Sequence, residues 1–306
     1  MVNAPAWTRE RAAELLRSPG PGDDKYRRGV VGLRTGSARY PGAAVLGVEA
    51  AWRAGSGMVR YVPGSESPGA RSAVPGLAAP AAAVLAARPE TVFGTGRCDA
   101  WVIGSGTDPA LRTAAEAAAL RALLRGTAPV VVDAGALDLV RGIGSEHAPL
   151  VLTPHAGEFA RLAERGAAES GRDSAADGAA RDAAVAELAA ELGATVLLKG
   201  SVTRCASPNG EVLHAGPATP WLASAGTGDV LAGALGALLA QHAEAVRADA
   251  ALPVRLAATA AVLHDAAARI AAGDPEGRGA GRPITARDVA DALPAAWAEL
   301  VGRVER

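Results

Sequence analysis

The 306-residue chain is poor in lysine, in aromatic residues and in cysteine. Its two cysteines, Cys98 and Cys205, do not have zinc-site spacing, so we expect a reduced, cytoplasmic protein, although one disulfide stays possible. The first residues lack the apolar core of a signal peptide, and no apolar run is long and unbroken enough to span a bilayer. A net charge of -1 argues against nucleic acid or a membrane as a partner.

Lysine is the most informative of these shortages. Of 31 basic residues, only Lys25 and Lys199 are lysines, so the chain uses arginine wherever a generic positive charge suffices. A lysine in such a background is a candidate for a role that a planar guanidinium does not fill, such as a compact charge among phosphates.

Hydrophobic residues make up 49% of the chain, which is enough for a large core. Strand-like and helix-like segments alternate, and this predicts an α/β fold with a central, mainly parallel sheet and helices on both faces. We expect residues 1–22 to form an N-terminal helix and linker, and residues 23–306 to form a single domain. In such a sheet the ligand site lies at the carboxyl ends of the strands.

Local signals predict several element boundaries. Proline at a first helical position predicts helices that start near Pro109 and Pro154, and polar residues predict a surface loop over 164–178. Residues 194–207 read as one strand that forms a hairpin with 211–216 through "PNG". The remaining predicted helices cover residues 6–18, 41–55, 181–193, 226–241, 254–273 and 285–300.

The turn "SAGTGD", residues 224–229, is the clearest candidate site. Gly226 and Gly228 flank Thr227 and allow successive N–H groups to converge, and the helix that follows adds positive charge at its amino end. These three residues predict an anion cradle. Asp229 follows at once, either as a helix N-cap or as a general base that removes a proton from a hydroxyl attacking a bound phosphoryl group.

Other turns fall at predicted strand ends. Lys199 in "LLKGSVT" is either a contact for phosphate or adenylate or a surface lysine. His155 in "TPHAGEF" either caps or packs, or it uses its place at the same sheet edge for binding. Asp133 in "VVVDAG" either holds magnesium through water or stabilises its turn.

Small residues at two further turns allow a ligand to approach the backbone, or they simply pack helix against sheet. These are Gly106 in "VIGSG" and Ala43 in "SARYPGAA". The first turn has too few glycines for a dinucleotide fingerprint. His264 lies beside an apolar stripe at helical spacing, and we interpret it as structural.

Three of these turns, taken in order, resemble the motifs of one known family. "TPHAGEFARL", "LLKGSVT" and "LASAGTGDVLAGALGALLAQ", in this order, resemble the motifs of the ADP/ATP-dependent NAD(P)H-hydrate dehydratases of the ribokinase-like superfamily. "GSARYPGAAVLGVEAAWRAGSGMV", "VIGSGTD", "PVVVDAGALDLV" and "ITARDVADALPAAW" extend the resemblance over nearly all of the chain after about residue 22. The resemblance implies a repair enzyme that phosphorylates the ring hydroxyl of NADH or NADPH hydrate, with ADP or possibly ATP as donor, and then eliminates phosphate.

The resemblance also implies residue roles, position by position. Asp229 is the expected catalytic base, and Gly226, Thr227 and Gly228 are the expected anion hole. Nucleotide contacts are expected from Lys199, Gly200, Ser201, Val202, Thr203 and Gly228, and contacts with the hydrated dinucleotide from Ala43, Gly106, His155 and Asp229. Mg2+ is expected through the nucleotide phosphates, with no metal ligand from the chain. A homotetramer and a separate NAD(P)H-hydrate epimerase are the expected partners.

Three motifs depart from the family pattern: "DDKYRRG" replaces a His-Lys-Gly stretch, "TGS" has one glycine fewer, and "DAG" replaces Asp-Ala-Asp. Two other functions stay open. A ribokinase-like kinase for a vitamin precursor would share the anion cradle and the aspartate. A nucleotide-binding module without catalysis is the second, although the complete Gly-Thr-Gly-Asp turn and Lys199 argue against it.

Overall fold

The computed structural model describes residues 4–65, 77–163 and 175–304. The strands are β1 (Val30–Arg34), β2 (Met58–Tyr61), β3 (Val92–Phe93), β4 (Ala100–Ile103), β5 (Val130–Val132), β6 (Leu150–Leu152), β7 (Thr195–Leu198), β8 (Thr203–Ala206) and β9 (Val212–Ala215). The α-helices are α1 (Arg9–Ala13), α2 (Pro41–Arg53), α3 (Pro80–Ala87), α4 (Ala114–Leu124), α5 (Ala156–Leu162), α6 (Ala175–Leu192), α7 (Thr227–Gln241), α8 (Ala243–Ala248), α9 (Leu252–Ala271) and α10 (Ala286–Val304).

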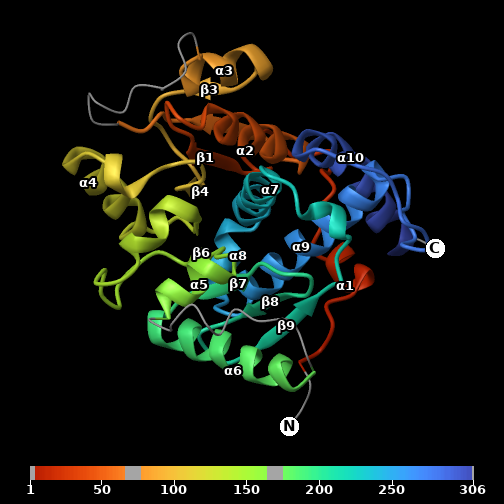
Figure 1. The fold of residues 1–306 in the computed structure, drawn as a ribbon. Helices are drawn as coiled ribbons and strands as arrows, with labels where there is room; N and C mark the ends of the chain where they lie inside the picture. The colour runs from red at the N-terminus through yellow and green to blue at the C-terminus, as the bar shows by residue number, and fades with distance from the viewer. Residues whose placement is uncertain (1–3, 66–76, 164–174, 305–306) are drawn as a thin grey trace.

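The strands form one sheet in the order β3-β2-β1-β4-β5-β6-β7-β8-β9 (Figure 1). Every pairing from β3 to β7 is parallel, and β8 and β9 are added antiparallel at one edge. The predicted α/β fold with a mainly parallel sheet is therefore confirmed. The chain order reverses beside β1, which pairs with both β2 and β4, and ligands bind α/β sheets at such a switch point.

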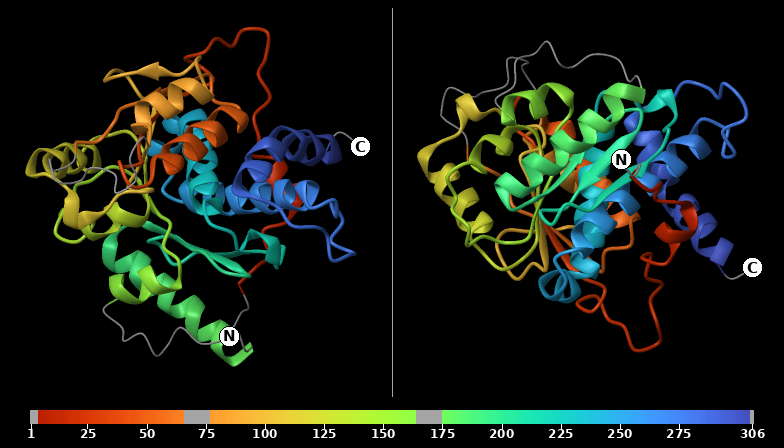
Figure 2. Two further views of the ribbon diagram at one scale, coloured as in Figure 1. Left: turned by 45° about the horizontal axis from the view of Figure 1, so that its top comes forward. Right: turned by 90° about the horizontal axis from the view of Figure 1, so that it is seen from below.

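The two faces of the sheet carry separate cores, as the alternation of side chains requires. Val131 of β5 belongs to a cluster with α2, α7, α9 and α10, whereas its neighbours Val130 and Val132 belong to a second cluster with α4, α5 and α6. Figure 2 shows α6 on one side of the central strands and α7 and α9 on the other. The short, wholly apolar strands of the sequence are thus strands covered on both faces.

Several predicted boundaries are wrong, each for a local reason. Pro109 begins a 3-10 turn, and α4 starts only after Thr113, whose hydroxyl accepts the Glu116 N–H at 3.0 Å. The helix expected at Pro154 starts at Ala156. α6 begins at Ala175, inside the predicted surface loop, and residues 164–174 of that loop lie outside the described residues.

The largest correction concerns the strand predicted over residues 194–207. The chain forms two antiparallel strands there, because it reverses direction over residues 199–202 between β7 and β8. The hairpin of β8 with β9 is present as predicted. α1 is shorter than expected, and the sequence reading missed α8. The three long helices at the end of the chain are confirmed.

Cys98 and Cys205 are both free. Within the described ranges, no helix is long and apolar enough to cross a membrane.

Helix α7 lies close to α2 because glycines meet at their crossing. A methyl group on Gly233 would collide with the backbone of Gly47. We expect Gly233→Ala to lower the free energy of unfolding by about 1–3 kcal/mol through overpacking, despite the better helix propensity of alanine. Denaturant titration measures this loss. Gly42→Ala, on α2 with nothing near the added methyl, is the matched control, and equal stability of the two variants would contradict the crossing argument.

Candidate active site at the strand ends

The "SAGTGD" turn forms the amino end of α7. Gly226 is its N-cap, in the left-handed conformation with φ of +89°, and a side chain there would collide with Leu46 and Ala286. The Thr227 hydroxyl donates to the carbonyl groups of Leu222 and Ser224, both at 2.9 Å, and fixes the turn. The first N–H groups of a helix have no partner within it, although Thr227 N–H donates to Ser224 O at 3.4 Å. Gly226 and Gly228 thus place backbone N–H groups at the amino end of α7, where a helix favours an anion.

Asp229 is the third residue of α7, and Gly226 is the N-cap. The interpretation of Asp229 as a helix N-cap is therefore wrong. The side chain is half-buried, and one carboxylate oxygen lies 3.9 Å from the place that a Gly226 methyl would take. Burial, as the larger cause, and the nearby Asp133 carboxylate together raise the pKa of Asp229 to about 7, against the opposing effect of the Lys199 ammonium. An acid with this pKa accepts a proton near neutral pH.

Lys199 follows β7 and pairs with a buried acid. Its ammonium donates to Asp133 Oδ1 at 2.9 Å, and the Asp133 carboxylate also accepts the hydroxyls of Ser105 at 2.9 Å and Thr153 at 2.8 Å. Asp133 is 3% exposed. Both of its oxygens accept hydrogen bonds, so Asp133 links the ends of four neighbouring strands.

The same ammonium faces the cradle. Lys199 Nζ lies 3.5 Å from the position that a methyl group on Gly228 would take, and 4.0 Å from Glu158 Oε2. A positive charge, a half-buried acid and the amino end of a helix therefore meet at one point, as phosphoryl transfer requires.

His155 caps α5, one of the two structural alternatives for it. Its Nδ1 accepts the N–H groups of Gly157 at 3.0 Å and Glu158 at 3.3 Å, and Glu158 Oε2 accepts the His155 N–H at 2.8 Å. The imidazole is 56% exposed at the sheet edge, beside Lys199.

Ala43, in the first turn of α2, and Gly106, which follows β4, lie against each other. A methyl group on Gly106, whose φ is +65°, would overlap the Ala43 side chain, so this turn needs a glycine for packing alone. Gly135, where the family pattern has a second acid, has no room for a side chain because Thr107 fills the space.

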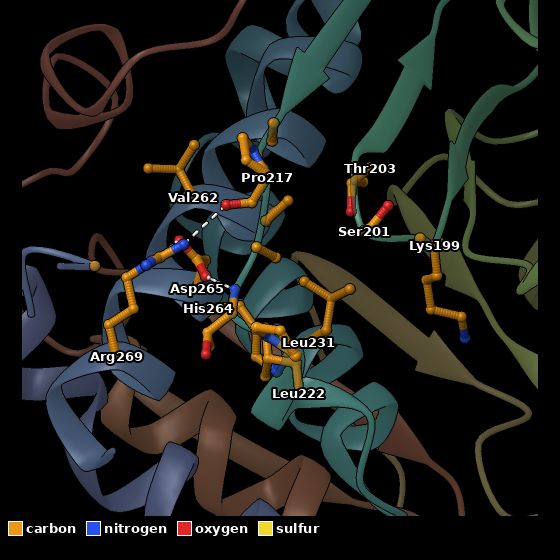
Figure 3. Close-up of a pocket in the computed structure, with 18 of the residues that line it drawn as sticks. Lys199, Ser201, Thr203, Pro217, Leu222, Leu231, Val262, His264, Asp265 and Arg269 are labelled. Atoms are coloured by element: carbon orange, nitrogen blue, oxygen red, sulfur yellow. Dashed lines mark hydrogen bonds and ion pairs between the residues drawn. The ribbon is translucent and has the colours of Figure 1, made fainter. Parts of the chain in front are cut away.

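A cavity of about 960 Å³ extends from the cradle along α9 (Figure 3). Five of the six residues predicted to contact the nucleotide line it: Lys199, Gly200, Ser201, Thr203 and Gly228. Val202 does not line it, and neither do Asp229 and the three other residues predicted for the dinucleotide. The cavity therefore borders Lys199 and most of the residues predicted for the nucleotide, whereas the residues predicted for the dinucleotide lie outside its lining.

The sequence did not predict that α9 forms one wall of this cavity. His264, interpreted as structural, lines the cavity together with Asp265 and Arg269, and burial lowers the pKa of His264 to about 4. Asp265 accepts the Thr219 N–H at 2.7 Å and the Arg269 Nε–H at 2.7 Å, which holds the loop before α7. The i, i+4 spacing of Asp265 and Arg269 was the available signal, although it does not tell which surface the pair faces.

The part of the chain that the structure describes has no cluster of three or more His, Cys, Asp or Glu side chains suited to a metal ion.

Comparisons with known proteins agree with this geometry. A family model for NAD(P)H-hydrate dehydratase matches residues 31–284. The bifunctional NAD(P)H-hydrate repair enzyme Nnr of Mycobacterium tuberculosis H37Rv is 45% identical over 233 residues, which are 72% of this chain and 43% of that protein. The ADP-dependent (S)-NAD(P)H-hydrate dehydratase of Xanthomonas campestris pv. campestris is 39% identical over 246 residues, which are 75% of this chain and 78% of that one.

Among solved structures, the ADP/ATP-dependent NAD(P)H-hydrate dehydratase of Bacillus subtilis, co-crystallised with ATP/Mg2+, superimposes with a TM-score of 0.78. It is 26% identical, and the match covers 98% of this chain and 100% of that one. The chain spans about half the length of the bifunctional relatives from Mycobacterium tuberculosis, Mycobacterium leprae and Corynebacterium glutamicum, from 43% to 50%.

The raised pKa of Asp229 has a consequence for stability. Between pH 4 and pH 7 the folded protein holds a proton that the unfolded chain has lost, so stability falls as the pH rises through this window. We expect Asp229→Asn to be more stable than the wild type at pH 8, by roughly 2–4 kcal/mol, and close to it at pH 4. Denaturant titrations at both pH values measure this. Glu244→Gln, at an exposed acid of α8, is the control and should not become comparably more stable at pH 8. An equal gain in stability in that variant would contradict the role of the raised Asp229 pKa.

Proposed function

The chain belongs to the NAD(P)H-hydrate dehydratase family, and from this premise we propose that it restores NADH or NADPH from their hydrates with ADP, or ATP, as phosphoryl donor. One observation carries the proposal: the Asp229 carboxyl, with its raised pKa, belongs to the first turn of α7, and the Lys199 ammonium faces Gly228 of the same turn. The relative from Xanthomonas campestris is named as ADP-dependent and the one from Bacillus subtilis as ADP/ATP-dependent. Both names support a nucleotide donor.

The proposed reaction begins with the cradle and Lys199 holding the phosphate groups of the donor. Asp229 takes the proton of the ring hydroxyl, whose oxygen attacks the terminal phosphorus while the bond to the nucleotide breaks. Phosphate then leaves with the electrons of the carbon–oxygen bond, driven by the lone pair of the ring nitrogen, and loss of a proton from the neighbouring carbon restores the double bond. A well-placed base is worth about 10²–10⁴-fold in rate.

Mg2+ is proposed to accompany the phosphates and to neutralise part of their charge. The residues support this arrangement only indirectly, because Asp133 uses both oxygens within the protein. No protein ligand is assigned to the ion, and no step depends on one.

The remaining assignments are proposals of the same kind. Gly200, Ser201, Val202 and Thr203 are proposed to contact the nucleotide beside Lys199. Ala43, Gly106 and His155 are proposed to contact the hydrated dinucleotide on the other side of Asp229. We also propose one catalytic domain over residues 23–306 behind the segment 1–22, a cytoplasmic homotetramer, and cooperation with a separate epimerase.

Recovery of the reduced-nicotinamide absorbance from hydrated NADH and ADP tests the function directly. Asp229→Asn should lose at least about 100-fold in kcat, because the amide takes up no proton, while ADP affinity measured by calorimetry stays within a few-fold. A variant that keeps more than a tenth of the wild-type rate would show that Asp229 is not the base. A stable phosphorylated alcohol, without recovered absorbance, would make the protein a kinase of the same fold.

The pH dependence tests the electrostatics of the base. Since Asp229 acts as the carboxylate, the rate should rise with pH through an inflection near 7. Asp133→Asn removes the negative charge that raises this pKa, so the inflection should move to lower pH. Ser105→Ala removes one donor to Asp133 and keeps its charge, so its inflection should stay near 7. An unmoved inflection in Asp133→Asn would mean that another group titrates.

A further inference from the structure

The large cavity has two chemically different ends. Lys199 and the cradle lie at one end, and Figure 3 shows Lys199 and Arg269 on opposite sides of the cavity. Between them the lining is mainly apolar. It includes Pro217, Ala218, Pro220, Leu222, Leu231, Ala261 and Val262. A phosphate group suits the first end, and a planar, uncharged group suits the middle.

The Arg269 end is bordered by a segment distant in the sequence, Ala6–Arg9, which we call the N-terminal strap. Its Arg9 donates to Pro275 O, and Arg269 lies against Gly277 of the same loop. All four residues of the strap line the cavity, together with Glu276 and Gly277. The strap precedes residues 31–284, which match the family model, so the motifs that carry the family resemblance do not include it.

The backbone of the strap is held against the edge of the sheet. Trp7 N–H donates to the carbonyl group of His214 in β9 at 2.6 Å, and His214 N–H donates to Pro5 O at 3.1 Å. The Trp7 indole N–H donates to the Thr259 hydroxyl of α9 at 3.0 Å. Trp7 is thereby fixed by two elements of the core.

The end of the strap is held by Arg9. Its guanidinium pairs with Glu299 of α10 at 3.1 Å and donates to Pro275 O at 3.0 Å, next to Glu276 and Gly277 in the lining. The strap and this loop therefore form one continuous wall. A wall fixed at four points is pre-organised, which reduces the entropic cost of ligand binding.

We propose that the nucleoside end of the bound donor lies against the N-terminal strap, so that the strap determines affinity for the nucleoside and not for the phosphates. The proposal rests on the proposed function, because it takes the donor to be a nucleoside diphosphate or triphosphate. With the phosphates at Lys199, the ribose and base extend along the apolar lining. A cavity of about 960 Å³ is in the range that encloses a ligand of this size.

Ala6 offers the sharpest test, because its side chain is exposed and lines the cavity. Ala6→Trp should fill the nucleoside end and raise the Kd of Mg-ADP at least tenfold, while the Kd of inorganic pyrophosphate stays within about twofold. Calorimetry on the full chain measures both. Ala245→Trp, at an exposed alanine of α8 outside the lining, is the matched control and should change neither value.

Arg9→Ala tests the same wall by loosening it, and it should weaken ADP and spare pyrophosphate, whereas Lys199→Met should weaken both. Unchanged ADP affinity in Ala6→Trp would overturn the proposal, and so would an equal loss for ADP and pyrophosphate, which would indicate damage to the cradle. The outcome is independent of turnover: a wild type that binds ADP without restoring NADH refutes the proposed function and leaves the strap to be judged by these affinities.

Discussion

The site depends on one buried charge. Asp133 is almost fully buried, and an ionised carboxylate in such a place is stable only when donors surround it. It has three: the hydroxyls of Ser105 and Thr153, which follow β4 and β6, and the ammonium of Lys199, which follows β7. The same contacts hold the ends of four parallel strands in register and aim Lys199 at the amino end of α7. Stability and function therefore share this network.

The position of α7 depends on a second constraint, the absence of side chains at its crossings. Gly233 meets Gly47 of α2, and Gly236 lies against Val31 and Val102 of the sheet, so the helix approaches both more closely than any larger residue would allow. This close packing buries the first turn and desolvates Asp229. The raised pKa of Asp229 thus has two causes, burial and the charge on Asp133.

Sequence reasoning predicts where these turns lie in the fold when the signal is local. The strands are short apolar runs, their carboxyl ends converge in a parallel sheet, and the turns that carry Lys199 and Asp229 stand at those ends. It fails where the signal is distant or weak. One glycine, Gly200, did not reveal the reversal between β7 and β8, and helical periodicity assigned His264 to the core without showing that a cavity borders it. The strap meets β9 across about two hundred residues, which no local pattern indicates.

The balance of charge explains why a chain that prefers arginine keeps a lysine at position 199. The cation has to donate to Asp133 and lie within 3.5 Å of the space above Gly228. A compact ammonium on a flexible stem satisfies both demands, whereas a planar guanidinium favours a bidentate carboxylate partner. Lys199, paired with Asp133, lowers the pKa of Asp229 less than burial and the Asp133 charge raise it. An arginine turned toward Asp229 would stabilise the carboxylate and lower its pKa, and so would remove the basicity that burial creates.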